Sequence, residues 1–157
     1  MTPAINLAKK AKIAFKVHEY THDPDNAAYG LEAAEKLGLP PTQVFKTLVV
    51  NLDGKELAVG IVPVAAMLSM KHLAKAAHAK KADMADKALV ARTTGYVLGG
   101  VSPLGQKKLL KTFIDESALQ FSTIYVSAGR RGLEIELAPQ DLQSLTRAVF
   151  TPLIHTE

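Results

Sequence analysis

One lysine lies in a segment whose other residues are mostly apolar, and its chemistry calls for a partner. Lys46 falls within Val44–Val50, whose residue types favour a β-strand. Side chains alternate along a strand, so even-numbered residues share the face of Lys46 and odd-numbered ones point the other way. Because both faces are mostly apolar, we expect a central strand with Lys46 in or beside the core. An ammonium group there needs a cleft or a partner, and the alternative is a strand-end lysine that reaches outward into solvent.

A second candidate is the loop Gly99–Pro103, which reads Gly-Gly-Val-Ser-Pro. Adjacent glycines allow backbone N–H groups to turn toward a ligand that side chains would otherwise block, and Pro103 stiffens the exit. Such a loop can hold a carbonyl oxygen, a ribose hydroxyl or a phosphate. Its spacing matches neither the P-loop nor the dinucleotide-binding glycine pattern. The alternative is a tight irregular connection that binds nothing.

Basic residues occur in pairs along the chain. Arg130 and Arg131 stand between two glycines at an expected hairpin tip, where they could grip phosphates, although a solvated turn is the favoured interpretation. Further pairs lie at 80–81 and 107–108. The net charge of +4, from 19 cationic and 15 anionic residues, permits a polyanionic partner such as RNA without requiring one.

Several familiar kinds of catalytic centre have no support in the sequence. The chain has no cysteine, and its five histidines are not spaced as metal ligands on one helical face. No G-x-S-x-G elbow is present, so Ser102 and Ser127 could act as nucleophiles only with an unidentified base. We therefore expect no metal and no cofactor. An enzyme of this composition would depend on positioning and polar stabilisation.

The elements that must position these residues follow from periodicity and turn signals. Gly38 ends one helix, Asp53-Gly54 joins two strands, and Pro139 opens the last helix. We expect an α+β or α/β domain with a mixed sheet. The predicted helices begin at Thr2-Pro3 and cover Leu31–Leu37, Met67–Ala79, Asp86–Thr93 and Pro139–Ala148; the predicted strands are Phe15–Tyr20, Val44–Val50, Leu57–Val62, Thr112–Asp115, Thr123–Ser127 and Leu133–Leu137.

Length and composition fit one domain spanning residues 1–157. An apolar fraction of 48% and a charged fraction of 22% are ordinary for a globular protein and allow a sizeable core. The N-terminus lacks the apolar stretch of a signal peptide, and no apolar run is long enough to suggest a membrane span. We expect a cytoplasmic protein with no membrane partner.

Several blocks of the sequence resemble the YbaK-type aminoacyl-tRNA deacylases, which are related to the editing domain of bacterial prolyl-tRNA synthetases. The strand around Lys46 resembles the lysine strand of that family, and Gly99–Pro103 matches its G-x-x-x-P loop. The resemblance runs essentially from end to end. Its other blocks are Met1–Ala4, Glu32–Gly38, Ser102–Lys108, Ile124–Gly129 and Arg131–Leu133.

The resemblance implies a compact mixed sheet, partly closed like a barrel, with helices outside. It also implies removal of cysteine mistakenly attached to proline tRNA, and action on other cysteinyl-tRNAs, with the substrate's own thiol attacking its ester carbonyl. No protein nucleophile is then needed. The partners would be the 3′ end of an aminoacyl-tRNA and, by extension, prolyl-tRNA synthetase.

The same resemblance implies roles for individual residues. Lys46 would hold the carbonyl or the terminal ribose, and backbone N–H groups of Gly99, Gly100, Val101 and Ser102 would hold the carbonyl oxygen or the amino acid. The implied substrate-binding residues are Tyr20, Tyr29, Pro103, Ser127 and Glu134, with Tyr29 where the family pattern leads us to expect phenylalanine.

Two rival functions stay open at this stage. One is a deacylase for alanine or another small amino acid, because the sequence does not show the shape of the pocket. The other is a catalytically silent module that binds RNA or a synthetase. The presence of both Lys46 and the glycine loop argues against the silent module.

Overall fold

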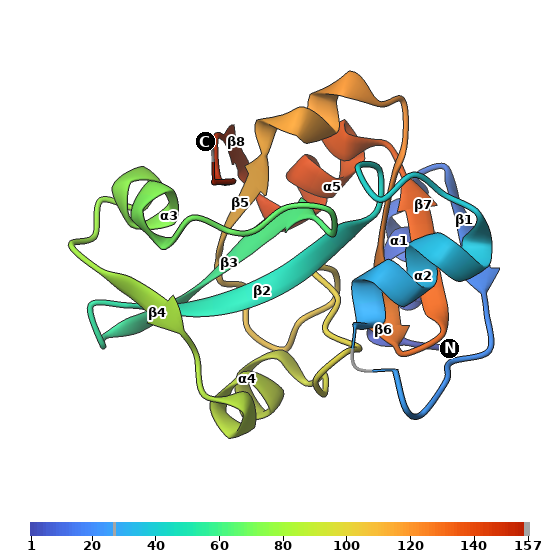
Figure 1. The fold of residues 1–157 in the computed structure, drawn as a ribbon, viewed down its shortest axis with the longest axis horizontal. Coiled ribbons are helices and arrows are strands. Elements are labelled where there is room, and N and C mark those ends of the chain that lie inside the picture. The colour runs from blue at the N-terminus through green and yellow to red at the C-terminus, as the bar shows by residue number, and fades with distance from the viewer. Residues whose placement is uncertain (27, 156–157) are drawn as a thin grey trace.

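The computed structural model describes residues 1–26 and 28–155, which form two β-sheets with helices packed around them (Figure 1). The helices are α1 (Pro3–Ala11), α2 (Tyr29–Leu37), α3 (Met70–Ala76), α4 (Lys87–Thr94) and α5 (Pro139–Thr146), with a short 3₁₀ helix at Glu116–Gln120. The strands are β1 (Phe15–Glu19), β2 (Phe45–Leu52), β3 (Glu56–Pro63), β4 (Ala82–Met84), β5 (Lys111–Asp115), β6 (Ile124–Arg130), β7 (Leu133–Leu137) and β8 (Val149–Thr151).

The larger sheet has the strand order β4-β2-β3-β5-β8 and combines both kinds of pairing. β2 pairs antiparallel with β3 and β4, whereas β5 runs parallel to β3 and to β8. β2 and β3 are joined by the Asp53-Gly54 turn, where both residues have positive φ. The predicted hairpin, the mixed sheet and the internal position of the Lys46 strand are all confirmed.

The smaller sheet has the order β1-β7-β6, and all its pairs are antiparallel. It meets the larger sheet beside β2, through a parallel bridge between Val44 and Tyr125 and a hydrogen bond of 3.2 Å from the Tyr125 N–H to the Gln43 carbonyl. Within residues 1–26 and 28–155 the two sheets do not join at a second seam, and no closed barrel forms. The expected mixed sheet is thus present as two sheets without barrel closure, and β1, β4 and β8 remain edge strands.

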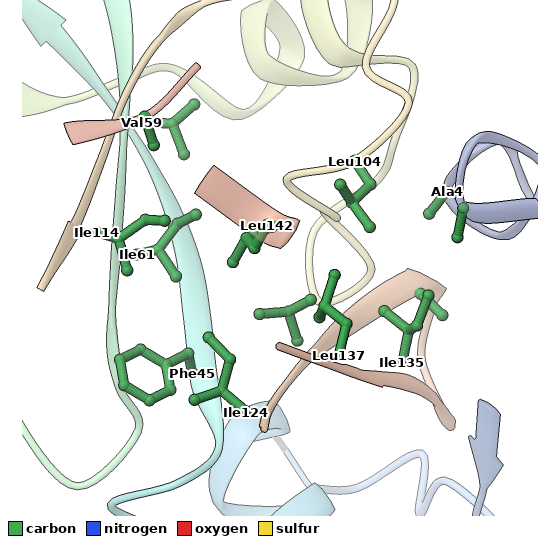
Figure 2. Close-up of a cluster of buried hydrophobic side chains, with 14 of the residues drawn as sticks. Ala4, Phe45, Val59, Ile61, Leu104, Ile114, Ile124, Ile135, Leu137 and Leu142 are labelled. Carbon is green, nitrogen blue, oxygen red and sulfur yellow. The ribbon is translucent and has the colours of Figure 1, made fainter. Parts of the chain in front are cut away.

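The main hydrophobic core lies between the two sheets. Figure 2 shows Phe45, Ile61 and Ile114 of the larger sheet pointing toward Ile124 and Leu142. Helices α1 and α5 complete this core through Ala4, Ile5, Ala8 and Leu142. A second cluster covers the other face of the larger sheet, where Leu73 and Ala74 of α3 pack against Val50 and Val62. β2 is thus covered on both faces, as its two apolar sides require.

Local signals explain where the helices begin and end. The Thr2 and Asp86 side chains accept hydrogen bonds from backbone N–H groups of α1 and α4, and Gly38 ends α2 with a left-handed φ of 69°. The helix predicted at 67–79 is shorter, because Ser69 caps it and Leu68 is taken up by a bridge to Ile154. Among the described residues, no helix combines the length and the apolar character that crossing a membrane would demand.

Candidate functional site

Residues from seven segments of the chain, one of them represented by Val64 after β3, meet around one cleft of about 330 Å³. Of the residues that the sequence singled out, the cleft is lined by Tyr20, Tyr29, Lys46, Gly99, Val101, Ser127 and Glu134. They come from the end of β1, from α2, β2, the loop after α4, and the hairpin strands β6 and β7. The cleft therefore forms where the two sheets meet, close to the bridge between Val44 and Tyr125.

Lys46 lies near the start of β2, directly opposite Val62 of β3. Burial lowers the pKa of its ammonium group, because an apolar environment disfavours the charged form. Among the described residues, no carboxylate forms an ion pair with Lys46. The lysine is therefore available to a ligand that brings negative charge or a polar oxygen into the cleft.

Glu134 of β7 also faces the cleft and is only 7% exposed. In the sheet it stands between Ser127 of β6 and His18 of β1. Burial raises the pKa of its carboxyl group to about 8. Within the described part of the chain, no hydrogen bond reaches this carboxyl group. At neutral pH it is therefore mainly a neutral acid that can both donate and accept.

Tyr20 contributes a second polar group to the same wall. Its backbone N–H donates to the Gly132 carbonyl at 3.0 Å, which ties the end of β1 to the β6–β7 hairpin. Burial, reinforced by the nearby Glu134, raises the pKa of its hydroxyl to about 12. The Tyr20 hydroxyl consequently stays protonated and can donate a hydrogen bond into the cleft.

The glycine loop contributes fewer groups to the cleft than its sequence suggested. Gly99 and Val101 line the cleft, whereas Gly100, Ser102 and Pro103 do not. The Gly100 N–H donates to the Val97 carbonyl at 2.9 Å, and the buried Ser102 hydroxyl accepts from the Leu104 N–H at 3.2 Å. These two polar groups serve the internal structure of the loop.

The structure adds wall residues that the sequence gave no reason to select. Gly30 is one of them, since a Cβ atom there would lie 2.3 Å from Cγ1 of Val64, so glycine permits α2 to approach β3. Arg131 lies outside the cleft, but its guanidinium carbon lies 4.4 Å from the centroid of the Tyr29 ring. The remaining cleft-lining residues are Ala28, Leu31, Phe45, Thr47, Leu48, Val64 and Leu98. These residues come together only through the tertiary arrangement of the strands, α2 and the loop after α4.

A buried ionic cluster fixes α2 against the loop that follows Tyr20. Glu32 is 1% exposed and accepts hydrogen bonds from Nδ1 of His22 at 2.5 Å and from the Asp23 N–H at 2.9 Å. Nζ of Lys36 lies 3.1 Å from its second oxygen. Burial alone would raise the pKa of Glu32, but these donors outweigh it and lower the pKa to about 2. His22 also lies beside Tyr29, with ring centroids 5.8 Å apart.

The basic pairs at 80–81 and 107–108 do not line the cleft. Asp53 accepts hydrogen bonds from the backbone N–H groups of Lys80 and Lys81, so this pair belongs to the β2–β3 hairpin end of the sheet. Lys108 lines a separate hollow with Lys55 and Lys111. Across the described ranges, no three histidine, aspartate or glutamate side chains are grouped so that they could hold a metal ion.

Comparison with known proteins gives a consistent result. Residues 25–145 match the family described as "Aminoacyl-tRNA editing domain". A protein of Enterococcus faecalis named "Putative Cys-tRNA(Pro)/Cys-tRNA(Cys) deacylase EbsC" is 38% identical over 156 residues, which cover 99% of this chain and 94% of that protein. An uncharacterized Bacillus subtilis protein, YwhH, is 27% identical over 73% of each chain.

Solved structures share the fold at lower sequence identity. One described as the "Crystal structure of a putative trans-editing enzyme for prolyl tRNA synthetase" superposes with a TM-score of 0.85 at 22% identity, covering 98% of this chain and 96% of that one. A scaffold protein used for computational epitope grafting superposes with a TM-score of 0.87 at 23% identity, covering 99% and 96% of the two chains.

Proposed function

We propose, because the chain belongs to the aminoacyl-tRNA editing domain family, that this deacylase removes cysteine from mischarged Cys-tRNA(Pro) and from Cys-tRNA(Cys). The proposal includes the chemistry, in which the thiol of the bound cysteine attacks its own ester carbonyl. The observation that carries it is the composition of the cleft. Lys46, Gly99 and Glu134 surround a space of about 330 Å³ that holds groups able to stabilise charge.

The proposed reaction breaks one ester bond and balances without a protein nucleophile. The thiol loses its proton, its sulfur forms a bond to the carbonyl carbon, and negative charge builds up on the carbonyl oxygen. The bond between that carbon and the ribose oxygen then breaks, and the ribose oxygen takes a proton. The products are a cyclic thioester and a tRNA with a free 3′ end.

The residues around the cleft supply what this sequence of steps needs. The ammonium group of Lys46, which has no ion-pair partner among the described residues, offsets the charge that develops on the carbonyl oxygen, as a preorganised positive charge does where negative charge builds up. The protonated Tyr20 hydroxyl donates to the same oxygen or to the leaving ribose oxygen. Glu134, kept neutral by burial, can accept a hydrogen bond from the α-amino group of the substrate.

The test measures release of amino acid from proline tRNA charged with cysteine, alanine or serine. We expect cysteine to leave fastest, and Lys46→Ala to lower that rate by about 100-fold or more, as loss of a charge-stabilising group does. Lys71→Ala is the matched control, because Lys71 is exposed on α3. Equal release of alanine and cysteine would rule out thiol assistance and favour a small-amino-acid deacylase. Unchanged turnover in Lys46→Ala would rule out the role of the lysine.

The proposed substrate also places the enzyme in the cytoplasm beside prolyl-tRNA synthetase, which would produce the mischarged tRNA. Adding that synthetase to the assay should then increase selectivity for Cys-tRNA(Pro) over Cys-tRNA(Cys). The same selectivity with and without the synthetase would argue that the deacylase acts alone.

A further inference from the structure

Arg131, at the tip of the β6–β7 hairpin, connects separate segments of the cleft wall. Its Nε and Nη2 atoms donate to the Leu98 carbonyl at 3.0 and 2.8 Å. The same guanidinium lies over the ring of Tyr29, 4.4 Å from the centroid. Leu98 and Tyr29 both line the cleft. One exposed side chain therefore holds the glycine loop and α2 in a fixed relation to the hairpin.

The forked bond determines how the peptide between Leu98 and Gly99 is oriented. A trans peptide is planar, so its C=O and N–H groups point in opposite directions. With the Leu98 carbonyl held by Arg131, the Gly99 N–H must point away from the guanidinium. Within the described residues, the Gly99 N–H has no hydrogen-bond partner, whereas the Gly100 N–H is used by Val97. Gly99 thus offers the free donor at this point of the loop.

The space behind Gly99 is filled by the same two side chains. Gly99 has a φ of 83°, and a Cβ atom there would lie 2.6 Å from Nε of Arg131 and 2.9 Å from Cδ2 of Tyr29. Glycine is required for both reasons, because the backbone conformation is left-handed and the position of a side chain is occupied. The packing leaves the peptide little freedom to rotate while Arg131 is in place.

We propose that Arg131 is a positioning residue, which orients the Leu98–Gly99 peptide so that the Gly99 N–H is presented to the carbonyl oxygen of the bound ester. Arg131 acts through the loop and does not touch the reacting atoms. The inference rests on the proposed deacylase function for its kinetic consequence, but the orientation of the peptide can be measured separately. It gives the hairpin arginine a function other than phosphate binding.

Three variants separate the forked bond from the charge. Arg131→Ala removes both, Arg131→Lys keeps the charge without the planar fork, and Arg130→Ala removes a neighbouring exposed charge whose nearest carboxylate, Glu19, is 4.0 Å away. We expect Arg131→Ala to lower kcat about tenfold with KM changed less than about twofold, because a misdirected donor weakens only transition-state binding. Arg131→Lys should be intermediate in kcat, and Arg130→Ala should match the wild type.

An NMR measurement of the Gly99 amide tests the orientation without any substrate. In ¹⁵N-labelled protein, we expect the Gly99 amide resonance to shift in Arg131→Ala and to keep its wild-type position in Arg130→Ala. An unmoved Gly99 resonance in Arg131→Ala would overturn the proposal. So would wild-type kcat in Arg131→Lys or equal losses in the Arg130 and Arg131 variants, since charge alone would then be responsible. If the wild type released no amino acid from any charged tRNA, the proposed function would fail while the resonance still decided the orientation.

Discussion

Two buried glutamates near the same end of the molecule have pKa values that are shifted in opposite directions. Glu32 of α2 is 1% exposed and has its pKa lowered to about 2, whereas Glu134 of β7 is 7% exposed and has its pKa raised to about 8. Burial raises the pKa of a carboxyl group in both places. The difference comes from the donors, because Glu32 receives hydrogen bonds from His22, the Asp23 backbone and Lys36.

This contrast distinguishes a structural carboxylate from one that is kept ready for a ligand. The protein satisfies Glu32 completely, so that its charge holds α2 in place. It leaves Glu134 beside an open cleft, where a substrate can supply the missing partner. The degree of burial alone would predict a raised pKa for both residues.

The largest effect should follow from removing the Glu32 charge. We expect Glu32→Gln to lower the free energy of unfolding at pH 7 by about 3 kcal/mol, because it breaks a buried ion pair and misplaces an amide among donors. Since the folded-state pKa is lowered, this stability is present above pH 4.5 and is lost as the pH falls toward 2. Urea unfolding measures it, with Glu35→Gln as the control on the exposed side of α2. Equal urea midpoints for the wild type and Glu32→Gln would contradict the claim that the buried charge of Glu32 stabilises the fold.

The dependence of folding stability on pH should have the opposite sign for Glu134. Its folded-state pKa is raised, so the contribution of the protonated carboxyl group to the free energy of unfolding is fully present below pH 4.5. That contribution is lost as the pH rises through about 8. We expect Glu134→Gln to become progressively more stable relative to the wild type as the pH rises from 5 to 9, because only the wild type must keep this carboxyl group protonated in the folded state. Urea unfolding at pH 5, 7 and 9 gives this difference. Glu136→Gln is the control, because burial would raise the pKa of Glu136 but hydrogen bonds from Thr123 and His18 outweigh it and lower that pKa. A difference between wild type and Glu134→Gln that did not depend on pH would refute the raised pKa.

The smallest effect should come from Lys36, which is the most exposed partner of Glu32. We expect Lys36→Met to lower the free energy of unfolding by about 0.5 kcal/mol, because water already screens much of this ion pair. Its amine also donates to the Thr21 carbonyl, so a small loss remains even at high salt. Thermal unfolding at low and high salt separates the contribution of the ion pair from that of the hydrogen bond to the Thr21 carbonyl. A loss as large as that of Glu32→Gln would show that the lysine, rather than His22 and the Asp23 backbone, stabilises the buried charge.

The parts of the fold that could be predicted depend on residues that are close together in the sequence. The strand around Lys46, the Asp53-Gly54 hairpin and the helix end at Gly38 all follow from local patterns, and the structure confirms them. The short strands β4 and β8 were missed, since each has only three residues and is defined by its pairing partner. The absence of a closed barrel depends on which strand edges meet, and no local pattern encodes that.

The sequence by itself determined that Lys46 lies in a strand with two apolar faces and that Gly99–Pro103 cannot be regular structure. The family resemblance pointed to Glu134 beside them, but only the tertiary structure decided the surroundings of its carboxyl group. Glu134 and Glu136 occupy the same face of β7 in an alternating strand, so periodicity treats them alike. Glu134 becomes the buried acid of the cleft and Glu136 a partner of His18, because β1 and β6 place different neighbours beside each. Burial and hydrogen bonding set the acidity of a carboxyl group, and both are supplied by residues distant in the chain.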